Sequence, residues 1–315
     1  RQDRMTDSFA LRSSTFSSAS SALSRAGTPR LAQTSRRRYP EWAIGGEPLH
    51  LQRRIKIVEC GEPLVDLREV CPEVILAIPP ERLEMYATAT YLRKTPAEML
   101  KRAAAALPPG YRLRVSSAHR PIWAQARGYW RHFLRLLRRH PEWSYATIRR
   151  RINQLSHPPD VPYSPPGHSC GAAVDVTIVG PDGEPLDMVS PLKDTPRVRF
   201  TDVPGLSPEA QRNRQMLREA MTAGGFTNYR GEWWHWSYGD VCWALRAGLP
   251  TAIYGLIAPH GTLDELTLTV ERMIIRLEDV REEVEAALAR EEQEWQQRTE
   301  EQRTVAMAMD GRSRL

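Results

Sequence analysis

The chain has 315 residues, of which 41% are hydrophobic, and this is enough apolar content to build a sizeable core. No uninterrupted apolar run reaches the length of about 18 residues that a membrane-spanning helix needs, so we expect no membrane partner. The formal net charge of +6 belongs to residues 1–40, which hold eight Arg and two Asp, because residues 41–315 hold 36 basic and 36 acidic residues. The charge therefore indicates no anionic partner for the body of the chain.

Residues 1–40 also hold nine Ser and show no apolar periodicity, which predicts a disordered tail. A transit-type peptide and a loose nucleic-acid contact both fit an Arg- and Ser-rich tail. We favour an extension without a function of its own and predict no nucleic-acid partner.

The four cysteines are scattered and form no Cys-x-x-Cys pair, which is typical of a reducing compartment. No signal peptide opens the sequence, and we expect a cytoplasmic protein. The sequence begins with Arg, so a periplasmic or exported protein whose upstream signal was removed stays open as an alternative.

Residues 41–261 are interpreted as one domain of mixed structure. Strands are expected, from their β-branched content and alternation, at 54–60, 74–79, 111–120 and 172–179. Helices are expected, from caps and apolar spacing, at 95–107 with Thr95 as N-cap, at 122–140 and at 207–224. The arginines at 131, 135, 138 and 139 are interpreted as a solvated helix face, since no aromatic stacking platform accompanies them.

Residues 262–315 form a third segment with helical spacing. Thr262 and Glu265 make a capping box, and apolar residues then recur every three or four positions until about Arg290. This pattern predicts a long C-terminal helix with a coiled-coil-like seam. The seam fits a homodimer and fits equally a helix that packs on its own domain.

Asp175 interrupts an apolar strand, and a carboxylate there must be paired, hydrogen-bonded or bound to a metal. His168 lies seven positions earlier, so the two side chains converge only if the chain turns between them, which Gly171 allows. Glu232 precedes His235 by three residues. A catalytic zinc takes three protein ligands, which His168, Asp175 and His235 supply.

Glu232 is then a spare carboxylate that can act as general base on a zinc-bound water. The tryptophans at 233, 234 and 236 are expected to wall the site and exclude water.

Three motifs, GHSCGAAVDVTI (167–178), GEWWHWSYGD (231–240) and SAHRP (117–121), carry a family resemblance. Together they resemble the zinc D-alanyl-D-alanine dipeptidases of the vancomycin-resistance type, in the group that includes D,D-carboxypeptidases and the zinc-binding Hedgehog domain. The resemblance covers about 55–248. It implies an α+β fold of the Hedgehog/DD-peptidase type, with a small antiparallel sheet flanked by helices, followed here by the long C-terminal helix.

Carried over to this sequence, the resemblance implies one Zn²⁺ per chain on His168, Asp175 and His235, a small dipeptide substrate and a catalytic base at Glu232. It also implies that Arg120 binds the substrate and the transition state, a role for which its planar fork of donors is suited.

Three positions depart from the pattern. This chain has Ser117 and His119 where the dipeptidases commonly have Asp and Tyr, and Pro166 where a serine is usual. These departures leave the ligands intact and leave the identity of the dipeptide open.

Two other functions compete with a dipeptidase. A D,D-carboxypeptidase or another peptidoglycan peptidase would use the same zinc site on a longer substrate. A non-catalytic, zinc-stabilised binding domain would need no base, so Glu232 argues against it. The shape of the cleft distinguishes the first alternative, since a closed pocket fits a dipeptide and an open groove fits a polymer.

Overall fold

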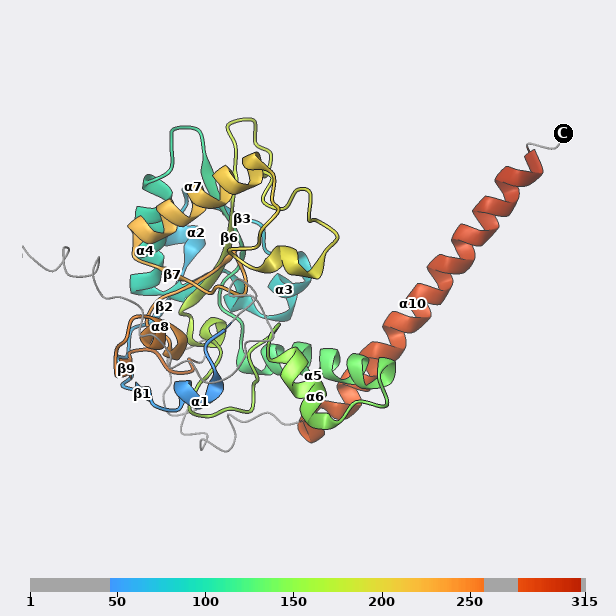
Figure 1. The fold of residues 1–315 in the computed structure, drawn as a ribbon, viewed down its shortest axis with the longest axis horizontal. Coiled ribbons are helices and arrows are strands. Elements are labelled where there is room, and N and C mark those ends of the chain that lie inside the picture. The colour runs from blue at the N-terminus through green and yellow to red at the C-terminus, as the bar shows by residue number, and fades with distance from the viewer. Residues whose placement is uncertain (1–45, 258–276, 313–315) are drawn as a thin grey trace, which may run out of the picture. The chain divides into compact units, whose positions relative to one another are not determined.

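The computed structural model describes residues 46–257 and 277–312. At its centre is a five-stranded sheet (Figure 1), whose order is β3 (Ile75–Leu76), β5 (Arg112–Ser117), β6 (Ala173–Val179), β8 (His235–Ser237) and β7 (Thr227–Asn228). Three of its four strand pairs are antiparallel, and β3 pairs with β5 in parallel. The expected α+β class with a small sheet and flanking helices is confirmed, with the correction that one edge of the sheet is parallel.

Two further strand pairs lie outside this sheet. They are β2 (Leu64–Asp66) with β4 (Tyr91–Arg93), antiparallel, and β1 (Lys56–Ile57) with β9 (Thr251–Ala252), parallel. The strands expected at 54–60 and 74–79 are therefore shorter than predicted. The remaining elements are the helices α1 (Leu49–Gln52), α2 (Leu67–Val70), α3 (Pro80–Met85), α4 (Lys94–Ala105), α5 (Ile122–Arg139), α6 (Tyr145–Ile152), α7 (Pro208–Gly224), α8 (Val241–Arg246) and α10 (Leu277–Arg312), and the 3₁₀ turns η2 (Ala87–Thr90), η3 (Gly167–Cys170) and η4 (Pro196–Arg199).

The alternation along β6 separates the two faces of the sheet. Val174, Val176 and Ile178 are fully or almost fully buried and belong to the main core, to which α4 and α7 contribute their apolar faces. Since neighbouring residues of a strand point to opposite faces, Asp175 lies on the face away from α4 and α7. The functional site is therefore expected on that second face.

The start of α4 corrects the predicted cap. The helix begins at Lys94, and its N-cap position is Arg93, whose side chain makes no capping hydrogen bond. Thr95 instead donates its hydroxyl to Glu62 Oε1 at 2.6 Å, and its backbone N–H donates to Glu62 Oε2 at 2.9 Å. A distant carboxylate thus satisfies a free N–H at this helix end, and the prediction failed because that partner is not local in the sequence.

The predicted helix α7 is confirmed at both ends. Ser207 Oγ accepts a hydrogen bond from the Ala210 N–H at 3.1 Å, as an N-cap does. The helix stops at Gly225, whose φ of 104° lies in the left-handed region.

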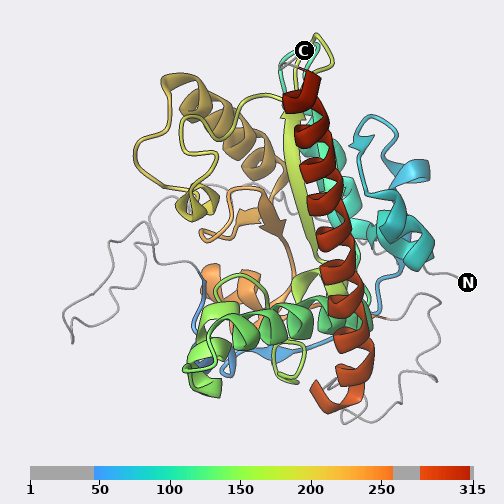
Figure 2. The same cartoon turned by 90° about the vertical axis from the view of Figure 1, so that its right-hand side faces the viewer.

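A second apolar cluster joins three helices, α5, α6 and α10. The helix α10 lies against α5 (Figure 2), and Leu277, Val284 and Leu288 of α10 pack with Trp130 and Phe133 of α5. The capping box at 262–265 lies outside the described residues, and α10 continues to Arg312, beyond the apolar seam. The homodimer through this helix stays a prediction. None of the described helices is long and apolar enough to cross a membrane.

Candidate active site

Strand register brings three site residues into one row. Asp175 on β6 lies opposite Ser117 on β5 and opposite His235 on β8. Residues directly opposed in an antiparallel pair point to the same face, so a single pairing brings together Asp175 and His235, which are 60 positions apart in the sequence. A bulge between Val115 and Ser117 locally bends β5 where this row begins.

His168 joins the row from a loop. It belongs to η3, and the chain then turns through Gly171, whose φ is 65°. A Cβ at Gly171 would lie 2.5 Å from the Leu64 side chain, so the turn needs glycine for space as well as for conformation. The predicted turn between His168 and Asp175 is confirmed.

The structure brings together the three predicted metal ligands. Asp175 Oδ1 lies 3.3 Å from His168 Nε2 and 3.0 Å from His235 Nδ1. One potential donor atom of each residue lies within 4.8 Å of those of the other two. This compact set of two imidazoles and one carboxylate is typical of metal sites, and the role of the three residues as ligands stays a prediction.

The hydrogen bonds of His168 test whether a cation fits. His168 Nδ1 lies 2.8 Å from the carbonyl oxygen of Ala118, to which it must donate. The lone pair of Nε2 then faces Asp175 Oδ1, and two electron-rich atoms at 3.3 Å need a proton or a cation between them. The residues present therefore fit a metal ion, with the tautomer fixed by the Ala118 carbonyl.

The pKa shifts of the three residues also favour a metal site. Burial lowers the pKa of His168 although Asp175 opposes this, so its imidazole is neutral near pH 7, which is the form that binds metals. Burial would raise the pKa of Asp175, but His168 and His235 outweigh it and hold that carboxyl ionised. For His235, burial lowers the pKa, and the hydrogen bond to Asp175 outweighs burial and raises it.

Glu232 lies in the turn that leads into β8, beside the three potential metal ligands His168, Asp175 and His235. Its backbone N–H donates to the Tyr229 carbonyl at 2.9 Å, and its carbonyl accepts from the His235 N–H at 3.1 Å. Burial raises the pKa of its carboxyl to about 7, with Asp175 adding to the increase and His235 opposing it. A carboxyl with a pKa near neutrality can accept a proton and give it back, as a general base must.

Arg120 reaches the same pocket and is held by two side chains. Its Nη1 donates to Gln125 Oε1 at 2.8 Å, and its Nη2 donates to Ser117 Oγ at 3.1 Å. Gln125 is itself fixed, because its Nε2 donates to Ser156 Oγ at 3.0 Å and to the His157 carbonyl at 2.9 Å. The guanidinium is thus oriented before any substrate arrives.

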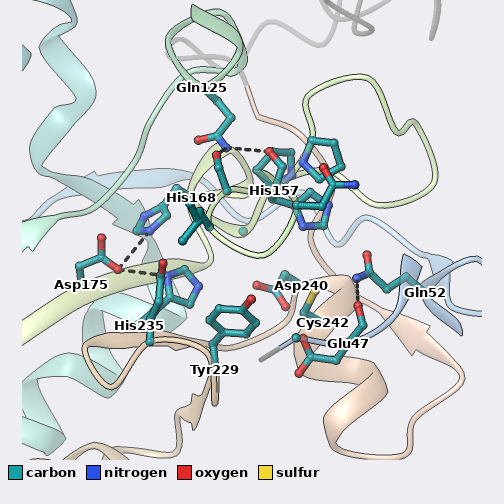
Figure 3. Close-up of a pocket in the computed structure, with 18 of the residues that line it drawn as sticks. Glu47, Gln52, Gln125, His157, His168, Asp175, Tyr229, His235, Asp240 and Cys242 are labelled. Carbon is teal, nitrogen blue, oxygen red and sulfur yellow. Dashed lines mark hydrogen bonds and ion pairs between the residues drawn. The ribbon is translucent and has the colours of Figure 1, made fainter. Parts of the chain in front are cut away.

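These residues line one cavity of about 240 Å³. His168, Asp175 and His235 lie at one side of it, and Glu47, Asp240 and Cys242 lie at another (Figure 3). Of the three tryptophans expected to wall the site, Trp234 lines the cavity. The expectation is wrong for Trp236, which lies in the main core, and for Trp233, which packs against that core. Trp236 follows His235 directly, so it points to the opposite face of the sheet.

Sequence reasoning missed Gln125 and Tyr229, which also line the cavity. Gln125 had a signal, since it is a polar residue on the otherwise apolar face of α5 that carries Ala126, Tyr129 and Trp130. Tyr229 had none, because a tyrosine in a turn is common.

The chain is similar in sequence to known D-alanyl-D-alanine dipeptidases. A D-alanyl-D-alanine dipeptidase of Synechocystis sp. is 28% identical over 254 residues, which cover 69% of this chain and 98% of that protein. The D-alanyl-D-alanine dipeptidase of Escherichia coli is 40% identical over 68 residues, 22% of this chain and 35% of that protein. That of Enterococcus faecalis is 34% identical over 74 residues, 23% of this chain and 37% of that protein.

The solved structure of the LdcB LD-carboxypeptidase aligns with a TM-score of 0.33 and 19% identity, over 68% of this chain and 80% of that one. Residues 81–249, more than half of the chain, match the profile of peptidase family M15, described as D-ala-D-ala dipeptidase. This range contains His168, Asp175, Glu232, His235 and Arg120. The chain belongs to the M15 family of D-Ala-D-Ala dipeptidases.

Proposed function

We propose that this protein is a zinc-dependent dipeptidase that hydrolyses D-alanyl-D-alanine or a related small dipeptide. The observation that carries the proposal is the row of Asp175 and His235, joined by His168, with the half-buried Glu232 beside it. Two imidazoles, one carboxylate and an additional carboxyl with a raised pKa are what a zinc peptidase site requires. A structural zinc site would have no use for Glu232.

Each residue has a distinct role in the proposed reaction. Zinc, held by His168, Asp175 and His235, supplies Lewis-acid chemistry that lowers the pKa of water and polarises a carbonyl. Glu232 accepts the proton of the attacking water and later gives it to the leaving amine, for which a pKa near 7 is suited. Arg120 donates hydrogen bonds to the oxygen that gains negative charge or to the substrate carboxylate.

The size of the cavity supports a small substrate. Its volume of about 240 Å³ lies below the roughly 300–1,000 Å³ that is usual for pockets of drug-sized ligands. A dipeptide of two small residues is a suitable occupant.

A second cavity supports the alternative of a D,D-carboxypeptidase or another peptidoglycan peptidase. This cavity, of about 890 Å³, runs along α5 and shares Arg120, Gln125, Leu155 and Ser156 with the first. A longer peptide could therefore extend from the site into it.

One assay separates the two functions. Purified protein loaded with zinc is incubated with D,D-, L,D- and L,L-dipeptides of alanine, and with a pentapeptide that ends in D-Ala-D-Ala. We expect rapid hydrolysis of D-Ala-D-Ala and slow release of alanine from the pentapeptide. A preference for the pentapeptide would support the carboxypeptidase, and no hydrolysis of any of these peptides would contradict both enzymes.

A further inference from the structure

Tyr229 is tied by its backbone to both the predicted base and a predicted ligand. Its N–H donates to the His235 carbonyl at 3.0 Å, and its carbonyl accepts from the Glu232 N–H at 2.9 Å. Its ring lies edge-on to the His235 ring, with centroids 5.8 Å apart. The side chain therefore occupies a fixed place next to the atoms that would react.

Two glycines hold the ring of Tyr229 on either side of its hydroxyl end. A Cβ added at Gly46 would lie 2.7 Å from ring atom Cε2, and a Cβ added at Gly231 would lie 2.6 Å from Cε1. These separations are shorter than any normal carbon–carbon contact, so any larger residue at either position must move the ring. Gly46 and Gly231 form a slot that fits this tyrosine closely.

The hydroxyl of Tyr229 makes no hydrogen bond with any residue that the structure describes. Two fully buried tyrosines of this protein differ from it: the Tyr129 hydroxyl donates to Asn153 Oδ1 and the Tyr254 hydroxyl to Glu62 Oε2, both at 2.6 Å. Tyr229 lines the cavity, and its hydroxyl points into it between His235 and Asp240 (Figure 3). Tyr229 is half-buried, and a tyrosine hydroxyl that is largely removed from water normally finds a hydrogen-bond partner, so the partner of this one is to be sought in the cavity.

We propose that Tyr229 is a further catalytic residue, whose hydroxyl donates a hydrogen bond to the scissile carbonyl oxygen as that oxygen becomes negatively charged. This inference rests on the proposed function. In the step concerned, the water oxygen bonds to the carbonyl carbon, a water proton passes to Glu232, and the C=O π electrons move to the oxygen. Tyr229 keeps its proton throughout. When the C–N bond breaks, the carbonyl re-forms and Glu232 returns the proton to the amine.

The geometry favours this role because the donor is aimed before the charge develops. A hydroxyl locked by its slot and lacking a protein partner needs no reorganisation when the oxyanion forms. Arg120 comes from the segment after β5, whereas Tyr229 comes from the turn after β7. Two donors from different segments can contact one oxygen from two directions.

The test uses the full, zinc-loaded chain with D-Ala-D-Ala as substrate. Tyr229→Phe removes the hydroxyl and keeps the ring in its slot, so kcat should fall on the order of 10²-fold with KM nearly unchanged. Binding by calorimetry adds a second readout: a phosphinate analogue of the dipeptide, which mimics the tetrahedral oxyanion, should lose at least about tenfold in affinity, while product D-alanine should lose little. Tyr145→Phe, at an exposed tyrosine, is the matched control.

A second variant guards against misfolding as an explanation. Gly231→Ala keeps the hydroxyl group on the tyrosine but displaces the ring and the hydroxyl with it, so it should also lower kcat, and its effect should largely vanish when combined with Tyr229→Phe. Unchanged kcat and unchanged analogue affinity in Tyr229→Phe would overturn the inference, as would a rise in KM alone. If the unchanged protein hydrolyses D-Ala-D-Ala and Tyr229→Phe hydrolyses it equally fast, only the role of Tyr229 is contradicted. If the unchanged protein hydrolyses no dipeptide, the proposed function is contradicted as well.

Discussion

The two faces of β6 and β8 differ in chemistry, although their residues are direct neighbours in the sequence. On one face Val174, Val176 and Trp236 are at most 2% exposed and pack in the main core with α4 and α7. On the other face Asp175 and His235 lie side by side, where each group must find a compensating partner. The first face gains stability from burying apolar surface, while the second retains charge in a poorly hydrated place.

This difference shows how stability and chemistry are kept apart within one strand. A shift of one residue in the β6–β8 pairing would place Asp175 in the core and a valine in the cavity. The apolar face therefore fixes the register on which the site depends. Changes on the site face should alter metal binding and turnover, and changes on the core face should alter stability.

The largest effect should follow from removing a ligand on the site face. His235→Ala is expected to lower zinc from about one per chain to well below that and to abolish dipeptide hydrolysis, because a three-ligand site loses one donor. Metal analysis after dialysis, beside the hydrolysis assay, measures both. His50→Ala, at an exposed histidine of α1, is the control. Full zinc content in His235→Ala would show that the row is not a metal site.

The second-largest effect should distinguish zinc binding from catalysis. Glu232→Gln should retain zinc while turnover falls by roughly 10² or more, since positioned proton transfer contributes on the order of 10²–10⁴. Glu184→Gln, at an exposed glutamate, should change neither. If Glu232→Gln hydrolysed the dipeptide as fast as the parent, Glu232 could not be the base.

A change on the core face should lower stability and leave zinc binding unchanged. Ile178 is fully buried, and Ile178→Ala should lower the free energy of unfolding by about 2–5 kcal/mol through lost burial and the cavity left behind. Chemical denaturation measures this loss, and zinc per folded chain should stay constant. Thr177→Ala, next to it on the other face, should cost much less. A loss of zinc from the folded Ile178→Ala protein would mean that the two faces are coupled.

A smaller effect is expected from Gln125. Gln125→Leu keeps the approximate shape of the side chain but removes the acceptor of Arg120 Nη1, which costs about 1–3 kcal/mol when a charged group is involved. Expressed as kcat/KM, this is a decrease of about 5- to 150-fold, with zinc content unchanged. Gln215→Leu, at an exposed position of α7, serves as the comparison. An unchanged kcat/KM would indicate that Ser117 alone orients the guanidinium.

No effect is expected from the tail. Deleting residues 1–40, which hold the net charge and lack apolar periodicity, should leave the melting temperature and zinc content unchanged. Differential scanning calorimetry of both proteins is sufficient. A clear drop in melting temperature would place the tail among the stabilising parts of the molecule.

The sequence predicted that His168, Asp175 and His235 lie together because these residues are chemically unusual at their positions. A carboxylate within Ala-Ala-Val-Asp-Val-Thr-Ile has few explanations, and Gly171 supplied the turn that lets His168 meet it. Long elements with local signals, such as α5 and α7, were also predictable from spacing and caps.

The features that the sequence could not predict depend on contacts between residues that are far apart in the chain. The Thr95 cap failed because Glu62 takes its hydroxyl, and the parallel pairing of β3 has no local signal. The tryptophans were assigned to one wall because their clustering was visible, whereas the alternation that sends Trp236 to the core depends on where β8 begins. Gln125 and Tyr229 acquire meaning only from the cavity that surrounds them.

The pairing of β1 with β9 has a consequence for the order of folding during synthesis. Lys56 of β1 pairs with Thr251 of β9, and Arg93 binds both Glu59, just after β1, and the carbonyl of Gly255, just after β9. Nearly 200 further residues must therefore be synthesised after β1 before its partner strand is available. Closing so long a loop is entropically costly, and contacts of such high sequence separation form late. A nascent chain that has not yet released residue 251 from the ribosome must leave β1 without its partner strand, and this segment should stay sensitive to protease until then.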